Sequence, residues 1–392
     1  MQIQNQSKMA EIILAQLPLD WKNWFSLNLN NGCKIETLLN DLVKNGFTID
    51  YENIPATHSV NTVSESIEND IISLLLAKHT PNQIASKYNN DRNILNAAIN
   101  IATSSAFKRL KETSHQLDKK TWLLNTVDSL AQLSSSYQTI PKIQAPSFNV
   151  FLDSYYSQHL PVILTGAIDH WPAKEKWNPE YLAQTVGDDL IEVQMGRSTQ
   201  KDFERNSHSL KKTISMREYV QMVENAGNSN DFYMTANNTS KSHASIKQLY
   251  EDVLVFGDQY TTELDIGNSS FLWFGPKGTF TPLHHDLTNN MLIQLYGRKK
   301  VTLIPATQVP HIYNDRWVFS EIGNPEEVDL EKYPEWKNVT PIECILEEGD
   351  ALFIPIGWWH CVESLDTSIS LSFVNFNAKN DYSAAFPRGE YE

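Results

Sequence analysis

The stretch that decides the fold of the second half of the chain is Met291-Leu292-Ile293-Gln294-Leu295-Tyr296-Gly297-Arg298-Lys299-Lys300-Val301-Thr302-Leu303-Ile304. Two β-rich runs, residues 291–296 and 300–304, are separated by a glycine that permits a tight turn, a pattern typical of a β-hairpin. Side chains alternate across a strand, so Lys299, Val301 and Leu303 are predicted to share one face.

Further short β-rich runs surround this segment and are divided by Gly, Pro and Asp turns. The runs are residues 161–164, 190–195, 271–274, 351–354 and 368–376, with one intervening helix predicted at 215–225. Such spacing favours a β-sandwich or barrel over a parallel α/β sheet. Within the last run, Ser368–Phe373 alternates polar with apolar residues, which predicts a half-buried strand.

Residues 10 to about 133 follow a helical period, because apolar residues recur there at three- and four-residue spacing. Thr80-Pro81-Asn82-Gln83 is predicted to begin one helix, with a cap and a first-turn proline. Turn-forming residues gather at 134–147 and predict a linker. The sequence therefore predicts an α+β protein with a helical domain at 1–140 and a second domain at 147–392.

Composition narrows the class of protein. The 392 residues carry 32 Lys+Arg against 47 Asp+Glu, a formal net charge of −15, and 41% are apolar, as in a globular protein. Apolar runs are far shorter than the roughly 20 residues of a membrane span, and the start of the chain has no signal-peptide pattern. We therefore predict a cytoplasmic protein without a membrane partner. Three scattered cysteines predict neither a disulfide framework nor a thiolate zinc site.

The negative charge is concentrated late in the chain. Between His311 and Asp350 there are 11 acidic residues against 3 basic ones. This excess would repel a phosphate backbone, which disfavours nucleic acid as a partner, and would attract a basic partner. Acidic loops that only aid solubility explain the same excess.

A metal-ligand pattern lies in Thr281-Pro282-Leu283-His284-His285-Asp286, which contains His-x-Asp. On a strand, His284 and Asp286 point to the same face and can reach one ion. A third ligand, His360, follows a turn, a strand and a second turn much later in the chain. Two imidazoles and one carboxylate form the facial set of non-haem Fe(II) centres, which leaves three positions for a bidentate cosubstrate and O₂.

Zinc is the rival metal, because a His₂-carboxylate set also serves hydrolases. Such enzymes also need a nearby general base, often the Glu of His-Glu-x-x-His, and the sequence lacks that motif. Lys299 favours the iron interpretation, since a lysine on a face of Val and Leu is costly unless an anion such as a cosubstrate carboxylate pairs with it. Spacing alone leaves a second interpretation open, in which Lys299 and Lys300 are exposed at a strand end.

Several motifs together resemble the Jumonji-C (JmjC) hydroxylases of the cupin superfamily. The motifs are Trp273–Thr279, Thr281–Asp286, Asn290, Gly297–Lys299, Phe353–Pro355 and Trp358–His360. The likeness spans roughly Ser147–Phe376 and is to the branch that includes the asparaginyl hydroxylase of hypoxia-inducible factor and the bacterial cupin-like oxygenases. It implies that residues 147–392 form a double-stranded β-helix, or jelly roll, after a helical domain of unknown role.

The resemblance also implies roles for individual residues. His284, Asp286 and His360 would be the catalytic iron ligands. Lys299, Thr281 and Tyr233 would bind the distal carboxylate of 2-oxoglutarate. Asn290 and Asn375 would lie beside the cosubstrate and the metal. His285 departs from the family pattern by placing a second imidazole beside the ligand. Strand alternation turns it away from the ion, so it is not assigned a role.

The activity implied by the resemblance is that of an Fe(II)- and 2-oxoglutarate-dependent dioxygenase, which uses O₂ to hydroxylate a protein or peptide side chain and releases succinate and CO₂. A small molecule or natural-product intermediate is the alternative substrate. N-methyl demethylation uses the same ligand set. An alternative of a different class is a non-catalytic cupin-type binding protein. The 17 residues after Asn375 are too few for a C-terminal dimerisation element, so a homodimer is predicted to use the N-terminal helices.

Overall fold

The computed structural model describes residues 13–30, 33, 35–47, 63–134, 137–236, 246–262 and 270–387. Residues 10–12 of the predicted helical half and residues 135–136 of the predicted linker lie outside these ranges. The chain divides into two units, Met1–Asp118 and Lys119–Glu392. The functional domain boundaries at 140 and 147 stay predictions.

Helices make up the described part of the first unit. They are α2 (Leu19–Asn30), α3 (Ile35–Lys44), α4 (Glu65–Leu76), α5 (Pro81–Lys87), α6 (Arg92–Thr103) and the start of α7 (Ser105–Ala131). Their apolar faces form two separate clusters, one around Phe25 and one around Ile84. The predicted helix start is confirmed, because Thr80 and Gln83 form a reciprocal capping box ahead of α5.

Two six-stranded sheets dominate the second unit. The first has the order β1-β2-β13-β8-β15-β6 and the second the order β10-β11-β7-β14-β9-β12. The strands of the first sheet are β1 (Lys142–Gln144), β2 (Val162–Thr165), β6 (Ser270–Gly275), β8 (Asn290–Tyr296), β13 (Ala351–Ile354) and β15 (Ser368–Phe373). Those of the second are β7 (Phe280–His285), β9 (Lys299–Ile304), β10 (Asn314–Arg316), β11 (Phe319–Ser320), β12 (Ile342–Leu346) and β14 (Trp359–Ser364).

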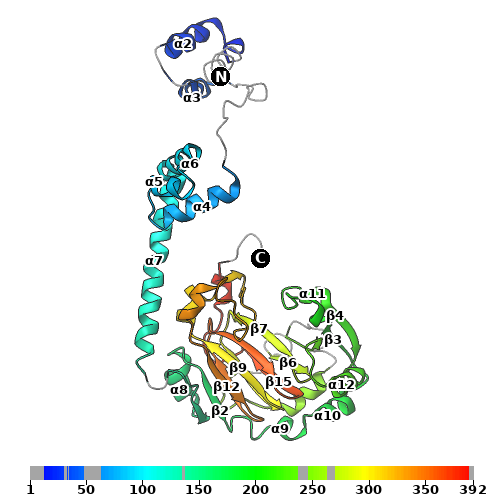
Figure 1. Ribbon diagram of the computed structural model, residues 1–392. Helices are drawn as coiled ribbons and strands as arrows, with labels where there is room; N and C mark the ends of the chain where they lie inside the picture. Colours follow the sequence, from blue (N-terminus) through cyan, green and yellow to red (C-terminus); the bar gives the residue numbers. More distant parts are fainter. Residues whose placement is uncertain are drawn as a thin grey trace. The chain divides into compact units, whose positions relative to one another are not determined.

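The two sheets face each other, as Figure 1 shows for β9 and β15, and apolar residues of both sheets meet in one cluster. The predicted α+β class with a jelly-roll sandwich is thereby confirmed. The predicted linker is only partly correct, because Lys142–Gln144 within it forms β1 and pairs with β2.

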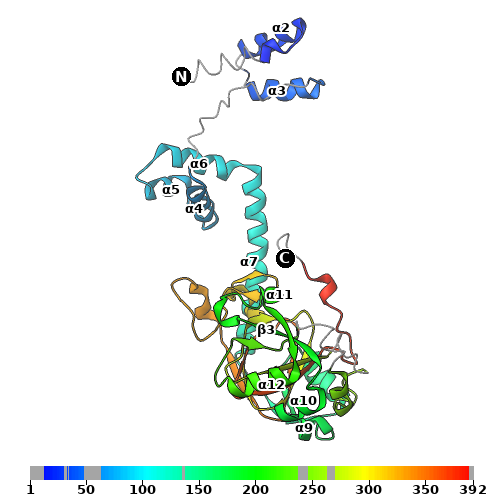
Figure 2. The ribbon, with the colours of Figure 1, turned by 90° about the vertical axis from the view of Figure 1, so that its right-hand side faces the viewer.

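Short helices and a small third sheet complete the second unit. They are α8 (Phe148–Phe151), α9 (Pro172–Lys176), α10 (Pro179–Val186), α11 (Ser207–Leu210), α12 (Met216–Asn225) and the strands β3 (Leu190–Met195), β4 (Lys211–Ser215) and β5 (Phe232–Tyr233), ordered β4-β3-β5. Helices α10 and α12 lie side by side (Figure 2). Helix α12 begins where the sequence predicts, since Ser215 caps its first turn.

The hairpin predicted for residues 291–304 is wrong in its pairing, although its turn is correct. Gly297 turns the chain with a φ of 69°, but β8 pairs with β13 and β15, whereas β9 pairs with β12 and β14. Both edges of β8 are occupied, so the turn carries the chain across to the opposite sheet. Leu292 and Leu303 then meet between the sheets. The predicted common face of β9 is correct and points into this interior.

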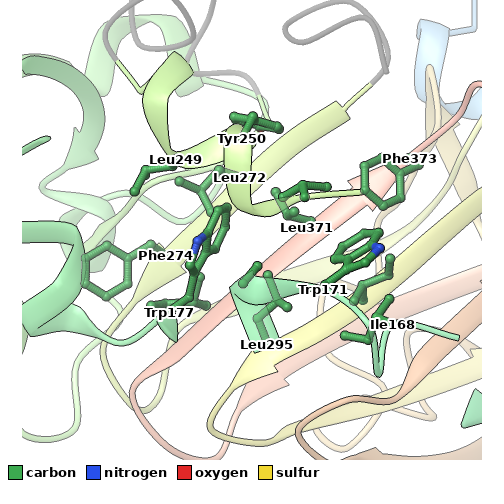
Figure 3. Close-up of a cluster of buried hydrophobic side chains, with 14 of the residues drawn as sticks. Ile168, Trp171, Trp177, Leu249, Tyr250, Leu272, Phe274, Leu295, Leu371 and Phe373 are labelled. Atoms are coloured by element: carbon green, nitrogen blue, oxygen red, sulfur yellow. The ribbon is translucent and has the colours of Figure 1, made fainter. Parts of the chain in front are cut away.

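The outer face of the first sheet carries the main apolar core. Trp171 and Trp177 pack there with Leu371 and other strand residues (Figure 3). Strand β15 is therefore not half-buried as predicted, because all six of its residues are buried. Its apolar residues face this core, and its serines face the interior, where Ser370 pairs with Gln294 of β8.

The last turns of α7 are held to the second unit by a buried carboxylate. Asp128 is 6% exposed and accepts hydrogen bonds from Tyr137 Oη at 2.7 Å and Thr307 Oγ1 at 2.8 Å. Gln308 Nε2 donates to both of its oxygens at 3.2 Å. A carboxylate with this many donors is costly to replace, because each donor would be left without its anionic acceptor.

Asp128→Asn should lower the free energy of unfolding of the second unit by about 1–3 kcal/mol. Urea denaturation followed by the fluorescence of the buried tryptophans measures this loss. Glu112→Gln, on an exposed position of the same helix, is the control and should change nothing. Equal stability of the Asp128→Asn variant and the wild type would contradict the anchoring role.

Candidate metal centre

The pairing of β7 with β14 places His284 directly opposite His360. Their ring centroids lie 4.2 Å apart, and Asp286 follows β7 immediately after His285. The Nε2 atom of His284 is 3.9 Å from Asp286 Oδ1, and that of His360 is 3.8 Å from Asp286 Oδ2. Two atoms that bind one ion at about 2.0–2.2 Å each lie within about 4.4 Å of each other. The three predicted ligands are therefore close enough to hold one ion.

Both imidazoles are oriented for metal binding by backbone carbonyls. His284 Nδ1 lies 2.8 Å from the Pro282 carbonyl oxygen and His360 Nδ1 lies 3.0 Å from that of Trp358. A carbonyl oxygen can only accept, so each Nδ1 carries the proton and each Nε2 presents its lone pair. Burial, together with the neighbouring His284, lowers the pKa of His360, so its ring is neutral at pH 7.

Asp286 is kept ionised by its neighbours. Burial alone would raise the pKa of this carboxyl group, but His360, His284 and the Asn290 hydrogen bond hold it below its ordinary value. Asn290 Nδ2 donates to Asp286 Oδ2 at 2.9 Å. The Oδ1 atom of the same amide is buried and has no hydrogen-bond partner among the described residues. A buried amide oxygen without a donor fits a further ligand at this end of the interior.

A β-bulge brings Thr281 to the same face as His284. The register between β7 and β14 runs from His284↔His360 to Thr281↔Val362, so three steps on β7 match two on β14. The extra residue falls at Pro282–Leu283, and a bulge resets which face the next side chain takes. Without it, alternation would turn Thr281 away from His284. The structure thus places Thr281, which is 8% exposed, on the interior face.

Lys299 lies inside the sandwich, so the alternative of an exposed lysine pair is wrong for this residue. It is 1% exposed, and burial lowers the pKa of its ammonium to about 7. Its Nζ donates to Tyr233 Oη at 3.0 Å, and no ion pair with a carboxylate forms within the described ranges of the chain. A buried ammonium without a counter-ion fits an anionic group that binds here.

Tyr233 ends β5 and reaches Lys299 because Gly275 leaves room for its ring. A Cβ atom at Gly275 would lie 2.6 Å from Tyr233 Cδ2 and 2.9 Å from Thr279 Cγ2. Only a glycine avoids this overlap. Tyr233 and Lys299 therefore meet in the interior, and Thr281 lies on the interior face of β7.

Sequence reasoning missed a set of polar residues that line the same interior. Trp273 Nε1 donates to Ser372 Oγ at 2.9 Å, and Ser370 Oγ donates to Gln294 Oε1 at 2.7 Å. Ser364 Oγ lies 2.9 Å from Ser368 Oγ. The one sequence signal for these residues was the alternation of serines with apolar residues in Ser368–Phe373. Such alternation fits a half-exposed strand, and it fits a strand between an apolar core and a polar interior equally well.

The sequence predicts Asn375 as a neighbour of the cosubstrate and assigns no role to His285. Asn375 follows β15, and its Nδ2 donates to the Thr262 carbonyl oxygen at 3.0 Å. Its role beside the cosubstrate stays a prediction. His285 faces away from the ligands as alternation predicts, since its ring packs on Trp359 at 4.8 Å in a separate apolar cluster.

Two facing, mainly antiparallel sheets with a His-Asp-His set between them define a jelly roll with a candidate metal centre. The family model described as "Cupin-like domain" matches residues 147–382. The chain belongs to this cupin-like family of JmjC type.

Three relatives illustrate the likeness. The chain is 32% identical to "Lysine-specific demethylase 8" of Xenopus tropicalis over 255 residues. This match covers 62% of the chain and 54% of the relative. It is 30% identical over 248 residues to "Lysine-specific demethylase JMJ30" of Arabidopsis thaliana, and this match covers 61% of the chain and 55% of the relative. It is 27% identical over 253 residues to "tRNA wybutosine-synthesizing protein 5" of Homo sapiens, and this match covers 61% of the chain and 78% of the relative. The chain thus spans only about half the length of the first two relatives.

Within the described ranges, no helix combines the length and the apolar character that crossing a bilayer requires.

His284→Ala should weaken the binding of Fe(II) or Mn(II) by more than about 100-fold, because one of three ligands is lost. Calorimetric titration of the metal under anaerobic conditions measures the affinity. His285→Ala is the matched control, since it removes the adjacent imidazole that faces away, and it should bind like the wild type. Equal losses in the two variants would mean that the ion is not held as the geometry indicates.

Proposed function

We propose that this protein is an Fe(II)- and 2-oxoglutarate-dependent dioxygenase that hydroxylates a protein or peptide side chain. His284, Asp286 and His360 would hold the iron, and Lys299, Thr281 and Tyr233 would bind the distal carboxylate of 2-oxoglutarate. Asn290 and Asn375 would lie beside the metal and the cosubstrate. Fe(II) and 2-oxoglutarate together supply the oxidising power, by which O₂ adds one oxygen atom to a C–H bond and the other to succinate, with loss of CO₂.

The observation that carries the proposal is the buried Lys299, which has no carboxylate partner among the described residues and lies in the same interior as the three ligands. Strand pairing places Leu303 opposite His360, and Lys299 lies four residues earlier on β9, about 13 Å along the strand. The lysine side chain covers part of that distance, and a five-carbon dicarboxylate spans the rest. A zinc hydrolase gives no role to this cation.

The chain's own residues would perform positioning and proton control. The two carbonyl oxygens behind the imidazoles fix their tautomers. Asn290 leaves Asp286 Oδ1 available for the ion by donating to Oδ2. The sheets bury His360 and Lys299, which strengthens the electrostatic contacts in that part of the interior.

Substrate class is the finer part of the proposal. Relatives named as lysine-specific demethylases support a protein substrate and keep N-methyl demethylation as an alternative to hydroxylation. The acidic loops at 311–350 would suit a basic segment of such a substrate. A relative named for tRNA weighs against excluding nucleic acid. A small-molecule substrate is the remaining alternative.

The proposed homodimer is supported by exposed apolar side chains of α7 such as Trp122 and Leu130.

Purified protein should convert 2-oxoglutarate to succinate only when Fe(II) and O₂ are present, and Asp286→Ala should abolish this conversion while leaving the fold intact. Succinate release measured by NMR, with circular dichroism of both proteins, tests it. An alanine variant as active as the wild type would end the proposal. Succinate formation by neither protein would favour the non-catalytic binding protein.

The affinity for 2-oxoglutarate should fall as the pH rises above about 7. The pKa of Lys299 is about 7 before binding, and a bound carboxylate raises it, so above pH 7 binding requires uptake of a proton. Each further pH unit then costs up to about tenfold in affinity. Calorimetry at saturating Mn(II) measures this dependence. Lys299→Arg keeps its charge and should bind with a flat pH profile. A flat wild-type profile would contradict the role of Lys299.

The substrate can be sought by mass spectrometry of a cell lysate incubated with the enzyme. Added oxygen on a protein side chain supports hydroxylation, and loss of methyl groups supports demethylation. Modification confined to small molecules or to RNA would overturn the proposed substrate class without affecting the assignment of the cofactors.

A further inference from the structure

Arg197 is a fully buried cation to which the proposed function gives no role. It lies in the short 3₁₀ turn η2 (Arg197–Thr199), and its side chain is 0% exposed. Its Cζ lies 5.2 Å from the ring centroid of Tyr233 and 4.3 Å from that of Phe203. Tyr233 is also the acceptor of the Lys299 hydrogen bond, so two cations, Arg197 and Lys299, lie near this ring.

The same guanidinium holds the start of β7. Arg197 Nη2 donates to the Phe280 carbonyl oxygen at 2.7 Å. The Phe280 N–H donates to Asn230 Oδ1 at 2.9 Å, and this oxygen also accepts from Arg197 Nη2 at 3.3 Å. Both backbone polar groups of the residue before Thr281 are therefore fixed by Arg197 and Asn230.

The charge of Arg197 is neutralised where it lies. Its Nη1 donates to Glu204 Oε1 at 2.8 Å and to Gln194 Oε1 at 2.6 Å, and both of these partners are buried. A paired guanidinium contributes orientation through its planar fork of donors. Lys299, which has no such counter-ion in the described part of the chain, is left to supply the net positive charge.

We infer that Arg197 is a positioning residue for the carboxylate-binding region. One planar group sets the ring of Tyr233 and the backbone that precedes Thr281, which are two of the three groups assigned to the distal carboxylate of 2-oxoglutarate. The inference rests on the proposed function and extends it to a residue on η2. Arg197 would act on the cosubstrate through these neighbours.

Arg197→Lys tests this role, because it keeps the charge and loses the fork that reaches Phe280, Glu204 and Gln194 together. The dissociation constant of 2-oxoglutarate, measured calorimetrically at saturating Mn(II), should rise by about tenfold or more. The affinity for Mn(II) itself should stay near the wild-type value, since the three ligands are untouched. In turnover, KM for 2-oxoglutarate should rise by a larger factor than kcat falls.

Asn230→Ala keeps the test valid if Arg197→Lys fails to fold, because it removes the shared acceptor at a half-buried position. It should weaken 2-oxoglutarate binding in the same direction by a smaller factor. The control is Lys211→Met, which breaks the 2.9 Å ion pair with Glu192 on the same three-stranded sheet and should leave the affinity unchanged. Thermal melting of each variant reports its folding.

The outcomes separate the inference from the proposed function. Wild-type affinity in a folded Arg197→Lys or Asn230→Ala variant overturns the role of Arg197 and leaves the function standing. A loss as large in Lys211→Met as in Arg197→Lys also overturns it, because general loosening of the sheet would then be the cause. No binding of 2-oxoglutarate by the wild type overturns both.

Discussion

The antiparallel pairing of β7 with β14 is the constraint on which the site depends. It fixes His284 opposite His360 and, through one extra residue at Pro282–Leu283, returns Thr281 to the same interior face. Both strands lie in the middle of their sheet, since β11 and β9 flank them. A slip of one residue would turn His360 outward and bring Cys361 inward, so the burial of both faces of the sheet also fixes the register of the ligands.

The interior between the sheets is built to hold something polar. A jelly roll of this size usually fills its interior with apolar side chains, as it does here around Leu292 and Leu303. The rest of the interior carries serines, Gln294 and Lys299, nearly all of them hydrogen-bonded to one another across strands. Such a network is stable only if its members are satisfied. Among the described residues, Lys299 donates to Tyr233 but meets no carboxylate, and the Asn290 Oδ1 atom has no hydrogen-bond partner. The proposed function assigns these two residues to the two ends of the cosubstrate.

Much of this could be predicted from the sequence. Strand positions, the helical half and the convergence of His284, Asp286 and His360 follow from alternation, period and spacing. The sheet to which each strand belongs does not follow from the sequence. A tight turn at Gly297 fits a hairpin and a crossing between sheets equally well. Only the fact that both edges of β8 are already paired shows that β9 joins the other sheet. The bulge that reorients Thr281 has no signal beyond Pro282. Arg197 was missed because two of its partners, Asn230 and Phe280, are distant in the sequence and meet it only in the folded chain.

Lys299 and Lys300 show how strand geometry assigns chemistry to identical residues. Lys300 faces outward and pairs with Glu326 and Glu363, and the hydrogen bond that it donates to Glu326 raises its pKa despite some desolvation. Lys299 faces inward with no carboxylate, and burial lowers its pKa to about 7. A buried lysine whose ammonium is partly deprotonated at neutral pH lowers the stability of the fold. A methionine of similar length at this position would avoid that loss of stability. Its presence makes sense if a carboxylate arrives during function, since the pair then forms in a region of low dielectric where its attraction is strongest. The same reasoning explains why Arg197 is paired with Glu204: two unpaired buried cations beside Tyr233 would repel each other before any anion bound.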